Sequence, residues 1–246
     1  MIEPLLLTTT RITTFDNERA LTSASGFFFE RDGRLHLVTS RHVFIDLTSG
    51  HRPNRIEIDL HADAVNLTLA HRLSLFLYRD GHSLWRQGSD AGGEIDVAVL
   101  KIDRALLPPT LELRCFTPAH LQGRLGEVEV GSSLLVVGYP LGFHDTVHYL
   151  PVVRQAVIAS SFGLRFQGQG FFLTDARTHR GTSGAPVVMR ARGHGPELGD
   201  LPWLLLGKAA ISGLALLLLW GRVLGPGNTS LKCVSVDRRS HLEPGA

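Results

Sequence analysis

Short apolar runs separated by turn residues recur along most of the chain. Two of them, RIEIDL (55–60) and EVEV (127–130), alternate between apolar and polar positions, which is typical of a half-buried antiparallel strand. ERDGRL (30–35) places Asp-Gly between two apolar runs, which predicts a hairpin turn. In chain order, we predict strands in SGFFFE, RLHLVTS, RIEIDLH, LTLAHRLSLFLY, IDVAVLKI, EVEVGSSLLVVGY, VVRQAVIAS, FFLTD, APVVMR and PWLLLG. Because no long segment has convincing helical spacing, the pattern predicts an all-β barrel or sandwich.

The strand pattern lapses once, in DRALLPPTLELRCFTPAHLQG (103–123), where three prolines lie close together. Proline cannot donate to a strand ladder, so this stretch is the best candidate for a connection between two halves. We therefore predict one unit over residues 1–112 and a second over 113–246. The polar tail from about residue 225 contains glycine and proline and receives no predicted element.

Composition narrows the class of protein. The 246 residues are enough for one large or two modest domains, and 43% of them are hydrophobic while 20% are charged, as in ordinary globular proteins. The formal net charge is +2, and the lysines and arginines are scattered. Nucleic-acid binding normally needs a basic stripe, so we expect no nucleic-acid partner.

Two features bear on the compartment. Cys115 and Cys233 are the only cysteines, too few for the disulfide framework of a small secreted domain. The first residues carry Glu3 where a signal peptide needs positive charge, and the apolar run beside it is short. Both observations favour the reducing interior of a cell, and we expect a cytoplasmic protein.

The segment LPWLLLGKAAISGLALLLLWGRVLG (201–225) is strongly apolar, and Lys208 is its only charge before Arg222. A membrane-spanning helix needs about 20 largely apolar residues, whereas the uncharged run from Ala209 to Gly221 is shorter and contains glycines. A core strand is therefore favoured over a membrane anchor. For the whole of 201–246 three interpretations stay open: a normal barrel closure, an anchor or an aberrant chain end.

The first candidate for a catalytic residue is Ser183, which stands between two glycines in RGTSGAPVVMR (180–190). Glycine and serine are common turn residues, so a surface turn is the alternative interpretation. A serine hydroxyl becomes a nucleophile only when a base, usually histidine, takes its proton, and a carboxylate then orients that base. The rest of the chain must supply both groups.

His42 and Asp96 are the best candidates for those groups. His42 follows a strand-like run in GRLHLVTSRHVF, and Asp96 opens the buried-looking strand of EIDVAVLKID. A carboxylate at the mouth of a buried strand destabilises the protein unless it is paired. Taken alone, Asp96 is better interpreted as a strand-end cap, but the three residues together carry more information than any one of them.

The order His42, Asp96, Ser183 resembles trypsin-like serine peptidases of the chymotrypsin fold. The matching motifs are SGFFF, LVTSRHVF, DVAVLKI, GYPLGF and TDARTHRGTSGAPVV, and the last of them is most similar to the bacterial Deg/HtrA branch. The resemblance covers residues 20–207, and no PDZ-like domain follows it. It implies two antiparallel β-barrels with the active site in the cleft between them, His42 and Asp96 coming from the first barrel and Ser183 from the second.

Carried over residue by residue, the resemblance implies roles for these side chains. Ser183 is the nucleophile, His42 the general base and acid, and Asp96 the orienting carboxylate. The backbone N–H groups of Gly181 and Ser183 form the oxyanion hole, and glycine at 181 permits the backbone orientation that this needs. The family requires no cofactor for catalysis.

The specificity pocket is predicted less directly. Aligned on the serine, Arg177 takes the position that carries an acid in trypsin, and a basic pocket floor would favour acidic substrates; the alternative is that Arg177 points to solvent. Thr178, His179 and Arg180 complete the candidate pocket residues. In GFHDTVHYL, His144 and His148 have the spacing of a helical metal pair, but the region reads as loop and strand, so we expect no metal.

Three functions are compared. The first is a serine endopeptidase that cleaves proteins or peptides through an acyl-enzyme intermediate. The second is a catalytically silent trypsin-like fold that acts as a peptide- or protein-binding module, and the third is a membrane-anchored protease, which rests on 201–225. Because every triad residue and the oxyanion glycine are present, the first is favoured; the sequence predicts neither the natural substrate nor the oligomeric state.

Overall fold

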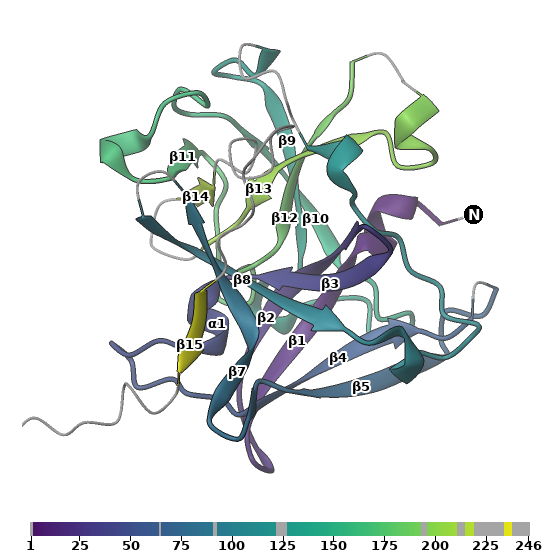
Figure 1. Ribbon diagram of the computed structural model, residues 1–246. Coiled ribbons are helices and arrows are strands. Elements are labelled where there is room, and N and C mark those ends of the chain that lie inside the picture. Colours follow the sequence, from purple (N-terminus) through teal and green to yellow (C-terminus); the bar gives the residue numbers. More distant parts are fainter. Residues whose placement is uncertain are drawn as a thin grey trace, which may run out of the picture.

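The computed structural model describes residues 2–63, 65–90, 93–121, 127–192, 196–210, 215–218 and 234–237. Strands dominate these residues, so the predicted all-β class is confirmed. In Figure 1 the first sheet fills the lower half of the molecule and the second sheet fills the upper half. All of the strand pairs within the sheets are antiparallel.

The first sheet has nine strands, in the order β15-β7-β8-β3-β2-β1-β4-β5, with β6 paired to β7. Their bounds are β1 (Thr9–Asp16), β2 (Arg19–Arg31), β3 (Arg34–Thr39), β4 (Arg55–His61), β5 (Ala70–Phe76), β6 (Tyr78–Arg79), β7 (His82–Asp90), β8 (Gly93–Ile102) and β15 (Val234–Asp237). Only β15 comes from the C-terminal part of the chain, and it pairs with β7 (Figure 1).

The second sheet has four strands, in the order β10-β9-β12-β13, and β11 pairs with β14 beside it. Their bounds are β9 (Ser133–Gly138), β10 (Val152–Val157), β11 (Phe171–Thr174), β12 (Pro186–Arg190), β13 (Trp203–Lys208) and β14 (Ala215–Leu218). The helical elements are short: α1 (Arg41–Phe44) and the 3-10 turns η1 (Pro4–Thr8), η2 (Arg104–Leu106), η3 (Pro118–His120), η5 (Pro140–Gly142), η6 (Phe166–Gly168) and η7 (Pro196–Leu198).

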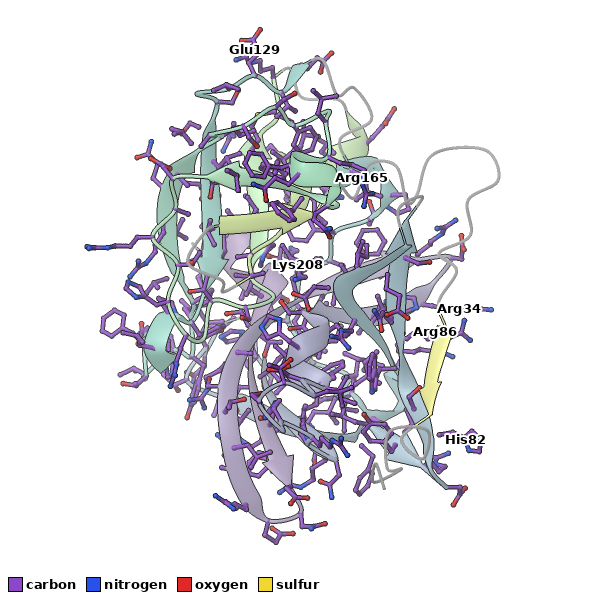
Figure 2. All side chains as sticks on the ribbon, turned by 90° about the vertical axis from the view of Figure 1, so that its left-hand side faces the viewer. Arg34, His82, Arg86, Glu129, Arg165 and Lys208 are labelled. Carbon is purple, nitrogen blue, oxygen red and sulfur yellow. The ribbon has the colours of Figure 1, made fainter. Side chains whose placement is uncertain are left out.

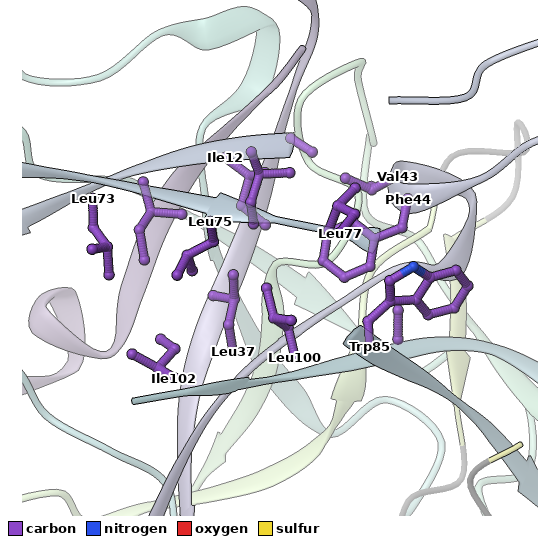
Figure 3. Packing of buried hydrophobic residues seen from close by; sticks show 14 of the residues in the cluster. Ile12, Leu37, Val43, Phe44, Leu73, Leu75, Leu77, Trp85, Leu100 and Ile102 are labelled. Carbon is purple, nitrogen blue, oxygen red and sulfur yellow. The ribbon is translucent and has the colours of Figure 1, made fainter. Parts of the chain in front are cut away.

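Alternating burial gives the first sheet its own core. Along β4 the apolar residues are buried and the polar ones between them are half-exposed, because successive side chains of a strand point to opposite faces. Trp85 and Phe44 meet edge to face, with ring centroids 5.6 Å apart. Figure 3 shows these rings at one end of the cluster of buried apolar residues. The members of this cluster come from seven strands, from α1 and from residues beside these elements.

A second cluster joins the two sheets. It combines residues of β2 and β8 with residues of the second sheet, and its members include Phe27, Val97, Val137, Val188 and Leu205. Burial of this shared apolar surface stabilises one sheet against the other. The sheets are therefore held in a fixed relation, which matters because the predicted site residues come from both.

Each of the ten predicted runs contains a strand, but one prediction within them is wrong. EVEV (127–130) is not a strand. Its residues enter a tight turn in which Ser132 N donates to Glu129 O over 3.0 Å and Gly131 has φ +85°. The carbonyl of Glu129 is used by the turn, and among the described residues EVEV is paired with no strand.

The hairpin predicted at Asp-Gly is confirmed. β2 ends at Arg31, β3 begins at Arg34, and Asp32 and Gly33 have φ of +51° and +70°, as a two-residue hairpin turn requires. Four strands lie outside the ten predicted runs: β1, β7, β14 and β15, the last of them in the tail after residue 225 that received no predicted element. β1 is rich in threonine, whose hydroxyls become buried because they find acceptors; Thr10 Oγ1, for example, donates to Asp59 O over 2.8 Å.

The connection near residue 112 runs along the first sheet before the chain enters the second. Glu112 N donates to His61 O, and Phe116 exchanges backbone bonds with β2. The boundary at 112 stays a prediction. In the apolar segment 201–225, residues 203–208 form β13 and residues 215–218 form β14. In the described residues no helix is long and apolar enough to cross a membrane; residues 211–214 and 219–225 lie outside the description.

Candidate active site

Strand pairing brings two of the predicted site residues together. β3 pairs with β8 in a register that sets Thr39 opposite Ala98. α1 begins immediately after β3, so its His42 reaches back over β8 and meets Asp96 near the start of that strand. The backbone N–H of His42 also donates to Asp96 Oδ1 over 3.0 Å, which fixes the turn against the strand.

The three predicted catalytic side chains form a continuous hydrogen-bonded chain. His42 Nδ1 lies 3.0 Å from Asp96 Oδ2 and 3.1 Å from Oδ1. His42 Nε2 lies 2.8 Å from Ser183 Oγ. The imidazole and the carboxylate are about one-third exposed, at 32% and 34%, and Ser183 is 3% exposed. A base within hydrogen-bond reach of a hydroxyl and itself oriented by an acid is the geometry that nucleophilic catalysis needs.

The backbone around Ser183 alternates between paired and unpaired N–H groups. Thr182 N donates to His179 O, Gly184 N to Ala209 O and Ala185 N to Thr182 O. In contrast, within the described part of the chain the N–H groups of Gly181 and Ser183 have no hydrogen-bond acceptor. Backbone donors in a native fold are nearly always paired, so two open ones beside a serine hydroxyl are able to bind an anion.

Neighbouring backbone holds the turn in this orientation. Gly181 has φ +90°, a region that favours glycine. A Cβ there would come within 2.3 Å of Tyr139 O, so glycine is also needed for close approach. Leu141 N donates to Arg180 O over 2.5 Å, which fixes the orientation of the Arg180–Gly181 peptide group and therefore the direction of the Gly181 N–H.

Ser25 ties the turn to the first sheet. Its buried hydroxyl donates to Gly181 O over 2.7 Å and accepts from Tyr139 N over 3.0 Å. Its backbone N–H donates to Ser183 O over 2.9 Å. Ser25 belongs to the motif SGFFF, but its role could not be predicted, because a serine in a strand carries no local signal of its distant partners.

Lys208 is the second residue that sequence reasoning missed. Its Nζ donates to Asp96 Oδ2 over 2.8 Å and to Ser40 Oγ over 2.7 Å. Burial of Asp96 raises the pKa of that carboxyl, but the Lys208 ammonium and the hydrogen bond from His42 outweigh it and hold the pKa well below its usual range. A lone charge in an apolar run was the available signal, since a buried lysine needs an ionised partner.

The predicted pocket residues lie on the segment before the oxyanion turn. Arg177 and Arg180 are exposed, whereas Thr178 and His179 are half-buried. The carbonyl of Arg177 accepts from Arg154 Nη1 over 2.8 Å. The exposed Arg177 side chain agrees with the solvent alternative, and the pocket itself stays a prediction.

His144 and His148 have separate partners. His144 Nδ1 lies 2.5 Å from Gly142 O, and His148 Nδ1 lies 2.7 Å from Asp145 Oδ2. Among the residues whose structure is described, no three histidine, cysteine or acidic side chains gather as a metal ion would require. The segment that carries this pair forms turns rather than a helix.

Comparison with known proteins identifies the family of the chain. Residues 24–194 match the model of the trypsin-like peptidase domain family. The serine protease HTRA1A of Danio rerio is 28% identical over 171 residues, which are 70% of this chain and 28% of that protein. The serine protease HTRA1B of the same organism is 25% identical over 174 residues, 71% of this chain and 29% of its own length. The chain thus spans less than a third of either relative.

Solved structures give the same fold. The serine endoprotease from Yersinia pestis has a TM-score of 0.51 at 19% identity, covering 87% of this chain and 59% of its own. An HtrA-type protease with a tripeptide has a TM-score of 0.53 at 18% identity, covering 87% and 56%. The predicted chymotrypsin-like all-β fold is therefore confirmed. The proteins that the chain resembles in sequence and in fold include HtrA proteases. Because the family model spans more than half of the sequence, the chain belongs to the trypsin-like peptidase family.

Proposed function

We propose that this chain is a serine endopeptidase in which Ser183 is the nucleophile, His42 the general base and acid, and Asp96 the orienting carboxylate. One observation carries the proposal: the hydrogen-bonded chain from Asp96 through His42 to Ser183 ends beside the two open N–H groups of Gly181 and Ser183. Both parts are needed. The hydroxyl needs a base that takes its proton, and the oxyanion formed by its attack needs hydrogen-bond donors.

The chemistry follows from these positions. His42 Nε2 takes the proton of Ser183 Oγ as that oxygen bonds to the carbonyl carbon of the scissile peptide. The carbonyl oxygen gains the negative charge and accepts from the N–H groups of Gly181 and Ser183. The protonated imidazole then gives its proton to the departing amine, which leaves an acyl ester on Ser183. His42 next takes a proton from water, whose oxygen attacks the carbonyl carbon of the ester. The imidazolium then gives that proton to Ser183 Oγ as the acid is released, which restores the free serine and the neutral histidine.

The substrate class that we propose is a protein or peptide. Family membership and the serine protease activity named for the relatives support this class. Asp96 serves the mechanism by holding the Nδ1–H tautomer, which leaves Nε2 free to accept the serine proton. It also stabilises the imidazolium that forms when His42 is protonated.

Labelling with a fluorophosphonate probe tests the proposal, because the probe bonds covalently to an activated serine. We expect purified wild-type protein to label, and Ser183→Ala and His42→Ala to lose labelling by at least about a hundredfold. The matched control is Ser133→Ala, which removes an exposed hydroxyl at the start of β9 and is expected to label as wild type.

A folded wild-type protein that does not label would contradict the proposal. The binding-module alternative would then be preferred, and immobilised protein would be tested for peptide retention without cleavage. Labelling that persists in Ser183→Ala would place the reactive hydroxyl elsewhere and would equally reject the assignment.

A further inference from the structure

Lys208 lies where the two sheets meet. It is the last residue of β13, which pairs with β12 so that Lys208 stands opposite Pro186, close behind the nucleophile turn. The side chain is 0% exposed. Figure 2 shows it near the middle of the molecule, between the first and the second sheet.

A lysine that is removed from water needs compensation for its charge. Its desolvation lowers the pKa of the ammonium, and the carboxylate of Asp96 opposes that effect. Asp96 Oδ2 and Ser40 Oγ each accept one of its protons, at 2.8 and 2.7 Å. An ammonium has three donors, and these two contacts direct it across the boundary between the sheets.

The same contact constrains the Asp96 carboxylate. Oδ1 accepts from the backbone N–H of His42 and faces His42 Nδ1, while Oδ2 faces that ring nitrogen and accepts from Lys208. Both oxygens are therefore held, and the carboxylate cannot rotate about its Cβ–Cγ bond without losing a charged partner. Charge-assisted bonds of this kind are stronger than neutral ones.

The cation also changes the electrostatics of the imidazole. A protonated His42 is stabilised by Asp96, and a positive charge bound to that carboxylate weakens the attraction. Asp46 and His51, in the segment after α1, also interact electrostatically with His42, and both remain in every variant below. Because the Lys208 ammonium is bound to Asp96, His42 faces a carboxylate whose negative charge is partly compensated.

We propose that Lys208 is a positioning residue of the triad, whose ammonium orients Asp96 and offsets part of the attraction of that carboxylate for a protonated His42. The proposal rests on the function proposed above, since it assigns Lys208 a role in the same site. It makes two predictions, one for the charge of Lys208 and one for its hydrogen bond to Asp96. Loss of the charge shifts the acidic side of the pH–rate profile, and loss of the hydrogen-bond donor lowers the rate on the plateau.

Two variants separate these effects. Lys208→Met removes both charge and donor at similar length, and Lys208→Gln removes the charge but keeps a donor. The control is Lys101→Met, an exposed lysine on the same strand as Asp96. The rate constant of fluorophosphonate labelling is measured against pH for each protein, after thermal unfolding has shown that it is folded.

We expect the acidic midpoint to rise by about half a pH unit or more in both Lys208 variants, because a positive charge a few ångströms from the imidazole has gone. The plateau rate should fall about tenfold or more in Lys208→Met and less in Lys208→Gln. Lys101→Met should leave both quantities unchanged. A midpoint within about 0.2 unit of wild type in the folded variants would overturn the proposal, whatever happens to the plateau. If Lys208→Met does not fold, Lys208→Gln carries the test.

A second measurement distinguishes this proposal from the proposed function. In the Ser183→Ala background, NMR follows the ring signals of His42, identified by their loss in a protein that also carries His42→Ala. The midpoint of that titration should rise when Lys208→Gln is added, and no activity is needed to observe it. An unmoved midpoint rejects the role of Lys208, whereas a wild type that folds but does not label rejects the proposed function alone.

Discussion

Single residues in the turn at Ser183 are constrained by backbone geometry on both sides of the nucleophile. Gly181 and Gly184 have φ of +90° and +86°. A Cβ on Gly184 would come within 2.2 Å of Ser25 O and of Thr39 Oγ1, so the turn is seated directly on the first sheet. At each position glycine is required by its φ and by the space available.

Gly181→Ala tests the oxyanion turn. The methyl group would collide with the carbonyl of Tyr139 and strain the positive φ, so the N–H at this position should move out of line. We expect the labelling rate to fall about a hundredfold or more, as when one oxyanion donor is lost. The control is Gly33→Ala, which has a similar φ of +70° and open space around it.

Gly33→Ala should reduce stability slightly and leave the labelling rate unchanged. Equal rates for Gly181→Ala and wild type would show that this N–H takes no part in the reaction.

Single residues also determine how the labelling rate depends on pH. Because the pKa of Asp96 is held well below its usual range, that carboxylate stays ionised from mildly acidic to alkaline pH. A histidine base must be neutral to accept the serine proton, so the acidic side of the profile is expected to come from its protonation. We expect the labelling rate to fall by about tenfold per pH unit once the histidine is protonated. A rate that is flat from about pH 5 to about pH 8 would rule out a histidine base.

Among the elements, β13 shows how a continuous apolar run serves a strand that is buried on both faces. Leu205 belongs to the cluster between the sheets and Leu206 to the cluster inside the second sheet. Neighbouring side chains of a strand point in opposite directions, so two buried faces require an unbroken apolar sequence. The run that raised a membrane anchor as an alternative is, over residues 203–208, a core strand.

Leu205→Ala tests this role of β13. The side chain is 1% exposed, and its removal should leave a cavity between the sheets, which costs about 2–5 kcal/mol of the free energy of unfolding. Urea unfolding measures the change. Leu164→Ala is the control, because that leucine is 69% exposed and its loss should change the free energy by less than about 0.5 kcal/mol. Equal effects of the two substitutions would contradict the packing described for β13.

For the whole molecule, the site exists only where the two sheets meet. Ser25 on β2 bonds to the carbonyls of Gly181 and Ser183 and accepts from Tyr139 N. Lys208 on β13 reaches the opposite way, to Asp96 on β8. Each sheet thus positions catalytic groups that the other sheet supplies, and relative movement of the sheets would disturb both sides of the triad.

Ser25→Ala tests this coupling. It leaves Tyr139 N and Gly181 O without a partner at a buried position, which should cost about 1–3 kcal/mol of stability. Because these groups position the oxyanion turn, we also expect the labelling rate of the folded protein to fall about tenfold or more. Stability is measured by urea unfolding and the rate under conditions where the variant is fully folded.

Ser23→Ala is the matched control on the same strand. Its hydroxyl is buried and has no hydrogen-bond partner among the described residues, so its removal should be neutral or slightly stabilising. If Ser25→Ala lost stability but kept the full labelling rate, Ser25 would act on the fold and not on the turn.

The sequence by itself determined the local features of this protein: individual strands, the hairpin turn and the candidate catalytic residues. Alternation in RIEIDL predicts a strand because the side-chain period of a strand is two, and Asp-Gly predicts a hairpin because both residues tolerate positive φ. The motifs around His42, Asp96 and Ser183 identified the candidate triad because nucleophilic catalysis requires those residue types. Each of these motifs is a run of consecutive residues, which can be read directly from the sequence.

The contacts between distant segments were decided only by the tertiary structure. EVEV alternates like a strand but, among the described residues, pairs with no strand and leads into a turn. Ser25 and Lys208 look like an ordinary strand serine and a stray charge in the sequence. They acquire their partners because two sheets pack face against face, and a buried charge is stable only where its counter-charge is also held. That pairing depends on the position of one sheet relative to the other, which no local pattern of residues specifies.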